Sequence, residues 1–204
     1  MRKTHFPYGT LLLCTLTLAY SMYVAVQVTG RPMGTVDIRR LEPYGAVTVK
    51  HLRDLEVWRL VAAQLIHAKQ LHMLYNVLSL ALLGALLERK PGPVWWIGLW
   101  FIAGSVGTVV STWFTQSPWN LGTGASQAVV GLAGYGLTQV GTDAGSKALV
   151  AVLCVTLLPA FALDLVHAGH PKPGHVAAVA VGVLAGFTQR FIAARSAQSR
   201  DLAR

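Results

Sequence analysis

The chain has 204 residues, of which 53% are hydrophobic and only 12% charged, and its mean hydropathy is +0.50. These values point to a lipid bilayer as the solvent and exclude an ordinary soluble domain. The net charge of +9 does not indicate nucleic-acid binding, because the Lys and Arg residues cluster beside apolar stretches, where anionic lipid headgroups attract them. Cys14 and Cys154 both lie inside apolar stretches, which gives no support to a disulfide framework.

Six apolar stretches predict an all-α polytopic membrane protein with six transmembrane helices. They cover residues 10–28, 71–87, 94–114, 126–140, 148–165 and 175–194. We interpret residues 10–194 as one membrane domain, with a short cytoplasmic segment at 1–9 before it and a basic tail at 195–204 after it. The first stretch has no small-residue cleavage pattern, so we expect it to stay attached as a helix.

The basic residues indicate the orientation of these helices. With both termini in the cytoplasm, nine of the 17 Lys and Arg residues lie on the inner side, and seven of the other eight lie in the first loop. The positive-inside rule is counted over short loops. Leaving out the long first loop changes the balance to nine against one. We therefore expect cytoplasmic termini and, because the core is a minimal one, a bacterial inner membrane.

The first loop, residues 30–70, is too apolar for a solvated linker. We expect it to pack on the outer leaflet of the membrane. Trp58 and Arg59 fit an interfacial anchor there, with the aromatic ring at headgroup depth and the guanidinium toward lipid phosphate.

Polar side chains occur in the first turns of the second, fourth and sixth predicted helices, which all run inward from the outer side. They are His72 and Asn76, then Ser126, then His175. Polar groups in a membrane usually face the bundle interior or a wet cavity, so these four residues are expected to converge. His72 and Asn76 are four residues apart and share one helix face.

Small residues favour close contact between the fourth and sixth helices. Gly131 and Gly134 lie in the fourth, and Gly182 and Gly186 form a GxxxG pair in the sixth. That contact would place Ser126 within hydrogen-bond reach of His175, as a nucleophile and its general base require.

The predicted fourth helix is short, so Ser126 is expected to start below the membrane surface, after an irregular segment that includes Gly124. Its amide, at a helix N-terminus, is placed to bind a developing oxyanion, and His72 and Asn76 can add donors. The pattern predicts acyl transfer, with an acyl-enzyme on Ser126 that water releases. An interhelical hydrogen-bond clamp is the other interpretation of His72 and Asn76.

These residues are where the sequence resembles the rhomboid family of intramembrane serine proteases. The matching motifs are Trp58-Arg59, the run His67, His72 and Asn76, Glu88 with Gly92, Gly124-Ala125-Ser126, Gly134-Tyr135, and His175 with Gly182. The resemblance covers nearly all of residues 57–187. The sequence differs from the family at Gln127, where a second Gly is usual, at Ala178, where Gly is usual, and at Val130, where an aromatic ring often packs on the base.

The resemblance implies a six-helix rhomboid-like bundle that cleaves transmembrane segments of membrane proteins near their outer ends, with a small residue before the cut. It also implies an oxyanion site formed by His72, Asn76 and the Ser126 amide. No metal or other cofactor is implied, and the expected partners are transmembrane substrates and membrane lipids, not nucleic acid.

Several alternatives stay open at this point. His167 or His170 could serve as the base, although both lie in a loop. Asp164, His167, His170 and His175 have a spacing that could bind a metal ion. The chain could also be an inactive rhomboid-like protein that binds membrane clients, or a small transporter, although it lacks the repeated halves typical of one.

Overall fold

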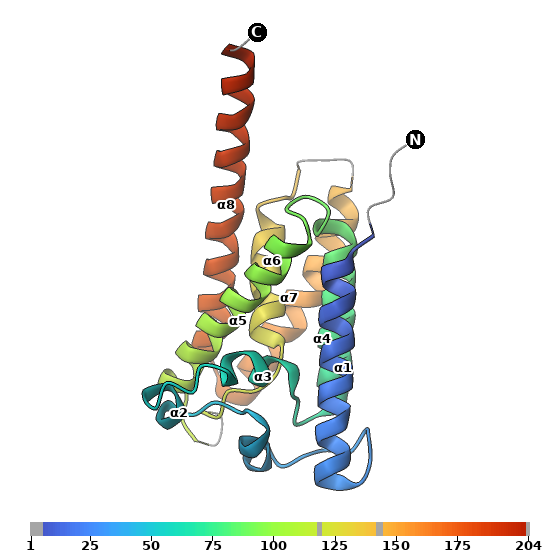
Figure 1. The fold of residues 1–204 in the computed structure, drawn as a ribbon, viewed down its shortest axis with the longest axis vertical. Helices are drawn as coiled ribbons and strands as arrows, with labels where there is room; N and C mark the ends of the chain where they lie inside the picture. The colour runs from blue at the N-terminus through green and yellow to red at the C-terminus, as the bar shows by residue number, and fades with distance from the viewer. Residues whose placement is uncertain (1–5, 118–119, 142–144, 203–204) are drawn as a thin grey trace.

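The computed structural model describes residues 6–117, 120–141 and 145–202, and these ranges are almost entirely helical (Figure 1). The elements are α1 (Tyr8–Thr29), the 3₁₀ helix η1 (Ile38–Tyr44), α2 (Val49–Arg53), α3 (Arg59–Leu65), α4 (Gln70–Leu87), α5 (Pro93–Phe114), α6 (Ser126–Leu137), α7 (Ser146–Ala168) and α8 (Pro173–Leu202). Within these ranges, five helices are long and apolar enough to cross a membrane, namely α1, α4, α5, α7 and α8. The predicted all-α polytopic fold is confirmed, and the chain is an integral membrane protein.

The helix predicted over residues 126–140 is shorter than expected. Helix α6 has 12 residues, which corresponds to roughly 18 Å at 1.5 Å per residue, against about 30 Å of hydrocarbon. It ends early because the amide and the hydroxyl of Thr138 both donate to the carbonyl oxygen of Tyr135, which closes a tight turn. Helix α6 is buried along nearly its whole length and packs against α4, α5, α7 and α8.

Helix α8 is longer than expected. It was predicted to end at residue 194, but it continues to Leu202 and projects beyond the other helices (Figure 1). Residues 188–202 contain no Gly or Pro and are rich in Ala, Arg and Gln, which favour helix. The start of α1 and the end of α8 lie at the same end of the bundle (Figure 1). Arg2, Lys3 and Arg204, three of the nine basic residues expected on the inner side, lie outside the described residues.

Glycines bring the backbones of α6 and α8 into direct contact. A Cβ atom on Gly182 would lie 1.8 Å from the carbonyl oxygen of Gly131, and one on Gly134 would lie 2.4 Å from that of Val179. One turn further along α8, Gly186 fits against the side chain of Thr138. A side chain at any of these glycines would push α6 and α8 apart. The close approach of the two helices, and with it the distance between their first turns, therefore depends on these glycines.

A buried carboxylate joins the end of α4 to the start of α1. Glu88 is fully buried and accepts hydrogen bonds from the amides of Gly9 and Thr10 and from the Thr10 hydroxyl, at 2.9, 2.7 and 2.5 Å. The first amides of a helix have no partner within the helix, and a negative charge is favourable beside them. Glu88 therefore acts as the N-terminal cap of α1.

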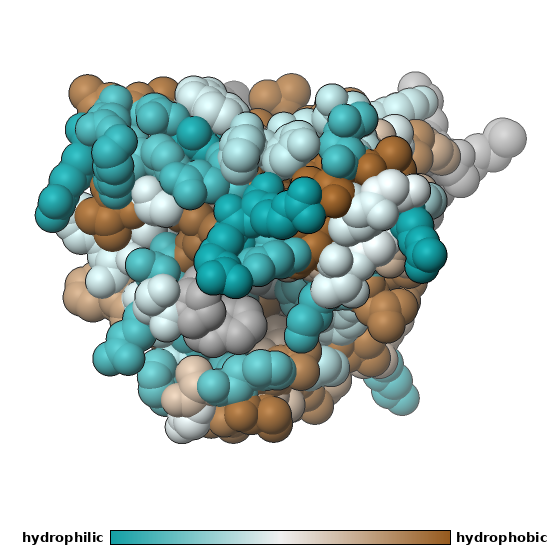
Figure 2. All heavy atoms as spheres, turned by 90° about the horizontal axis from the view of Figure 1, so that it is seen from below, coloured by the Kyte–Doolittle hydropathy of each residue, from teal (hydrophilic) through white to brown (hydrophobic). Residues whose placement is uncertain are grey.

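The first loop folds into η1, α2 and α3 at the end of the molecule that Figure 2 shows, where the surface is mostly hydrophilic. Arg59 donates to the carbonyl oxygens of Glu42 and Ala46, at 2.6 and 3.1 Å, and pairs with the Glu56 carboxylate. Its guanidinium is thus directed at the loop itself and stacks 4.6 Å from the Trp58 ring centre, instead of extending toward lipid phosphate as expected. Half of the Trp58 surface is exposed, so an interfacial role for its ring stays a prediction.

Candidate active site

The segment before Ser126 is held by contacts with the first loop and with α3. Val47 and Gly122 exchange two backbone hydrogen bonds of 3.0 and 2.8 Å, and the amide of Gly124 donates to the carbonyl oxygen of Ala63 at 2.7 Å. Gly124 has a φ of +93°, which favours glycine over any other residue. The first loop therefore fixes the backbone that presents Ser126 at the start of α6.

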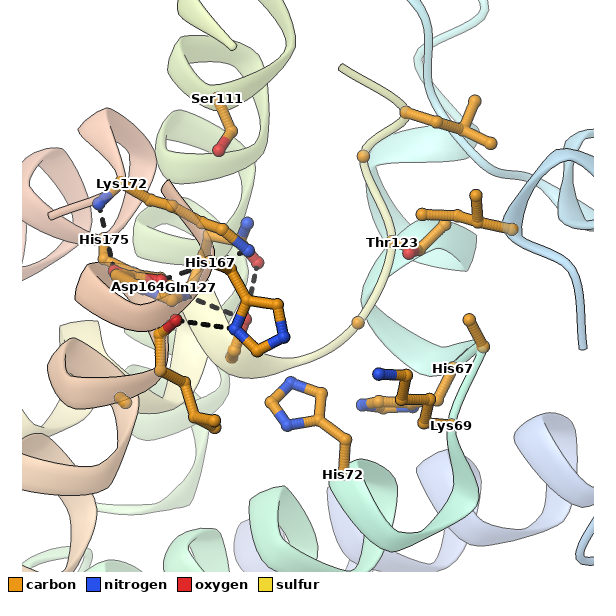
Figure 3. Close-up of a pocket in the computed structure, with 18 residues that line it drawn as sticks. His67, Lys69, His72, Ser111, Thr123, Gln127, Asp164, His167, Lys172 and His175 are labelled. Carbon is orange, nitrogen blue, oxygen red and sulfur yellow. Dashed lines mark hydrogen bonds and ion pairs between the residues drawn. The ribbon is translucent and has the colours of Figure 1, made fainter. Parts of the chain in front are cut away.

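Ser126 and His175 lie in hydrogen-bond contact. The Ser126 Oγ is 3.0 Å from Nε2 of His175, and both side chains are buried. The other ring nitrogen, Nδ1, is 2.7 Å from Oδ2 of Asp164. The three side chains come from α6, α8 and α7 respectively and form one line of hydrogen bonds, part of which Figure 3 shows.

Two further side chains contact this line. The Ser126 hydroxyl is also 3.2 Å from Oε1 of Gln127. The Phe161 ring meets the His175 ring edge to face, with centroids 6.2 Å apart and planes at 81°. Phe161, from α7, thus supplies an aromatic contact to His175, the contact that the sequence comparison with the family placed at Val130 of α6.

A cavity of about 250 Å³ opens beside Ser126 and His175. His72 lines it from α4, and Lys69, Lys172 and His167 lie around it (Figure 3). The first turns of α4, α6 and α8 thus border one space. A cavity of this volume with polar lining residues is large enough to hold several waters.

Asn76 does not line this cavity, in contrast to His72. It is buried, and its Nδ2 is 3.1 Å from Nε2 of His67. The same nitrogen of His67 accepts the amide of Ala125, at 3.2 Å. Two donors to Nε2 place the ring proton on Nδ1, which faces the hydroxyl of Ser21 at 3.5 Å.

His67 is neutral as well as buried. It lies in the link between α3 and α4, and burial lowers its pKa to about 3, with the neighbouring His72 as the second cause. A neutral ring matches the two hydrogen bonds that Nε2 accepts. His67 therefore joins α1, α4 and the segment before Ser126 without carrying a charge.

Asp164 and Phe161 are the residues of this site whose position the sequence did not reveal. From the sequence, Asp164 is expected only in a possible metal site, and no contact is predicted for Phe161. One signal was available: an acidic side chain inside an apolar span is costly and usually has a functional partner. Phe161 and Asp164 are also three residues apart, so they share a helix face.

The structure gives less support to His167 or His170 as the general base, and to a metal site, than to His175 as the base. The Nδ1 atoms of His167 and His170 lie near the carbonyl oxygens of Leu163 and Pro171, at 2.8 and 3.0 Å. Among the described residues, no group of three His, Cys, Asp or Glu side chains is arranged to hold a metal ion. Asp164 instead pairs with His175 and with Lys172.

Comparison with known proteins gives a family match over residues 54–191, to the model described as the Rhomboid domain. The chain is 32% identical to RHOMBOID-like protein 4 of Arabidopsis thaliana over 151 residues, which are 72% of this chain and 38% of that protein. It is 25% identical to Rhomboid protease GluP of Bacillus subtilis over 183 residues, 82% of this chain and 34% of that one. Rhomboid-like protease 3 of Toxoplasma gondii is 29% identical over 96 residues, 47% of this chain and 36% of that protein. The chain therefore spans well under two thirds of these relatives.

Proposed function

Because the chain belongs to the rhomboid family, we propose that it is an intramembrane serine endopeptidase that cleaves transmembrane segments of membrane proteins. The observation that carries the proposal is the contact of 3.0 Å between Ser126 Oγ and His175 Nε2 beside a cavity. A nucleophile and its base need this distance. Two relatives that bear the name of protease add support.

The chemistry follows from these positions. His175 Nε2 takes the Ser126 proton as Oγ attacks the substrate carbonyl carbon, and a tetrahedral oxyanion forms. His175 then gives the proton to the leaving amine, the C–N bond breaks, and the acyl group stays on Ser126. A water molecule from the cavity, deprotonated by His175, releases the acyl group as a carboxylic acid and restores the serine hydroxyl.

The Ser126 amide and the His72 ring are the proposed donors to the oxyanion. As the first residue of α6, Ser126 has an amide without a partner inside the helix. His72 lines the cavity. Asn76 would have to leave His67 before it could donate to the oxyanion, since its Nδ2 faces that ring.

For topology, we propose that the two ends of the described chain lie in the cytoplasm, on the charge balance outside the first loop. The active-site cavity would then open near the outer leaflet. The relatives come from Arabidopsis thaliana, Toxoplasma gondii and Bacillus subtilis, so they do not favour one type of membrane. A bacterial inner membrane stays a prediction.

The test uses purified protein in detergent, a fluorophosphonate that reacts with activated serines, and a panel of helix-destabilised transmembrane substrates. Wild type is expected to be labelled and to cut, whereas Ser126→Ala and His175→Ala do neither. Ser111→Ala is the matched control, because Ser111 also lines the cavity and its removal leaves labelling intact. Equal cutting by wild type and by both site variants would contradict the assignment.

A rhomboid-like protein that binds membrane clients without cutting them is the second candidate. One observation favours it: Gln127 Oε1 lies 3.2 Å from the Ser126 hydroxyl and competes with His175 for its single proton. That function predicts an unlabelled wild type that still retains transmembrane peptides on a column.

A further inference from the structure

We infer that Asp164 is a positioning residue that extends the Ser126 and His175 pair into a triad, with α7 as the helix that holds the base. This inference rests on the proposed function. Its basis is the contact of 2.7 Å between Asp164 Oδ2 and His175 Nδ1, formed by two side chains that are 2% and 4% exposed.

The aspartate decides which nitrogen of His175 carries the proton. A carboxylate oxygen at 2.7 Å can only accept, so Nδ1 donates to it and Nε2 is left as an acceptor. In that tautomer Nε2 can receive the Ser126 proton. Without Asp164, the tautomer with the proton on Nε2 would also be populated, and in that tautomer Nε2 cannot accept the Ser126 proton.

The tautomer of His175 also determines which acceptor takes the Ser126 proton. The hydroxyl has one proton and two acceptors within reach, Nε2 of His175 at 3.0 Å and Oε1 of Gln127 at 3.2 Å. A negative Asp164 behind the ring makes Nε2 the stronger acceptor of the two, because it stabilises the imidazolium that forms when the proton moves. Gln127 is therefore tolerated next to the nucleophile.

Asp164 itself is held in place from the link between α7 and α8. The backbone amide of Lys172 donates to the same oxygen, Oδ2, at 3.0 Å, and Lys172 Nζ lies 3.9 Å from Oδ1. One carboxylate thus orients the ring and fixes the chain that enters α8. The other charged or titratable side chains around the cavity are His72 and His67 near α4, Lys69 before α4, and His167 at the end of α7.

Phe161 contributes the second contact from α7. It lies one helical turn before Asp164 and meets the His175 ring edge to face. The two contacts fix different features of the ring: Asp164 sets the direction of its nitrogens, and Phe161 limits the tilt of its plane.

The structure suggests an informative substitution, Asp164→Asn. Because the Lys172 amide donates to Oδ2, the amide oxygen of Asn would take that position and could still accept from Nδ1. This variant keeps the tie to the α7–α8 link and removes the charge alone. Asp164→Ala removes both the tie and the charge.

We expect kcat for a transmembrane substrate to fall by about 10- to 10²-fold in Asp164→Asn, with KM within about twofold of wild type. The fluorophosphonate labelling rate falls in parallel. Asp164→Ala loses about 10³-fold or more. Asp164→Glu recovers part of the activity relative to Ala. Asp37→Asn is the matched control, because Asp37 pairs with Arg39 on the surface of the first loop, and it behaves like wild type.

A merely structural aspartate would give a different result. If Asp164 only tied down the α7–α8 link, Asp164→Asn would label and cut like wild type, and that result would overturn the inference while leaving the proposed function intact. A loss that appears in KM, or only in proportion to a lower thermal midpoint, would also overturn it. If wild type is not labelled at all, the proposed function and this inference fail together.

Discussion

The ring nitrogen Nε2 of His67 accepts a hydrogen bond from the amide of Ala125, 3.2 Å away, so a residue from the link between α3 and α4 holds the backbone directly before Ser126. This amide is therefore unavailable to a substrate, which leaves the amide of Ser126, a residue that lines the cavity, as the proposed backbone donor to the oxyanion. The contact also joins two segments that are 58 residues apart in the chain. His67 is thus a structural support of the site, and its neutrality has consequences for stability.

The stability of wild type should fall as the pH drops below about 6.5. The pKa of His67 is lowered to about 3 by burial, so below about pH 6.5 the unfolded chain binds a proton that the folded protein excludes. This contribution is complete above the unfolded pKa and decreases at up to about 1.4 kcal/mol per pH unit until the folded pKa is reached.

Thermal unfolding in detergent between about pH 7 and pH 4 measures this effect. His67→Gln lowers stability at neutral pH, but its midpoint should depend less steeply on pH than that of wild type. Parallel curves for the two proteins would contradict the prediction.

His72 and Asn76 should respond differently to substitution by Ala. His72 lines the cavity, so His72→Ala is expected to lower kcat by about 10²-fold with little change in the thermal midpoint. Asn76 is buried against His67, so Asn76→Ala should destabilise the fold by about 1–3 kcal/mol. The measurements are substrate cleavage and thermal unfolding of both variants. The distinction fails if Asn76→Ala keeps wild-type stability and loses kcat as His72→Ala does.

Gly182→Ala should separate α6 from α8 and so impair both stability and labelling of Ser126. The new Cβ would lie 1.8 Å from the Gly131 carbonyl oxygen, which neither backbone can avoid without moving. We expect a loss of about 1–3 kcal/mol or more. Gly98→Ala, also in a transmembrane helix, is the matched control, because nothing lies within 4 Å of its Cβ position. Similar unfolding midpoints for the two variants would rule out the proposed backbone contact.

Glu88→Gln should destabilise the bundle although it changes the size of the side chain very little. Both oxygens of Glu88 accept hydrogen bonds, from Gly9 and Thr10, and an amide NH₂ in place of one of them would face donors. The expected loss is about 1–3 kcal/mol, read from thermal unfolding in detergent. Asp54→Asn removes a surface pair with Lys50 and is expected to cost under about 1 kcal/mol. An equally small effect of Glu88→Gln would show that Glu88 is not the cap of α1.

The sequence by itself determined the membrane class, four helices close to their observed bounds, and the pair Ser126 and His175 as candidates. These features are local, because hydropathy over about 19 residues marks a span and a polar residue in a first turn stands out against apolar neighbours. The early end of α6 depends on the turn that Thr138 closes with Tyr135. The extension of α8 to Leu202 lies in a part of the helix that projects beyond the bundle (Figure 1). Hydropathy reports neither feature.

Only the tertiary structure decided which polar groups meet. Asn76 shares a helix face with His72, yet it turns to His67, and Asp164 from a helix without an expected role in catalysis reaches His175. Such pairings depend on how closely helices approach and on which rotamer each side chain adopts. The approach of α6 and α8 is set by glycine contacts such as Gly182 against Gly131, between residues that are distant in the sequence. The side-chain orientations depend on the partners within reach, such as His67 for Asn76 and the Lys172 amide for Asp164.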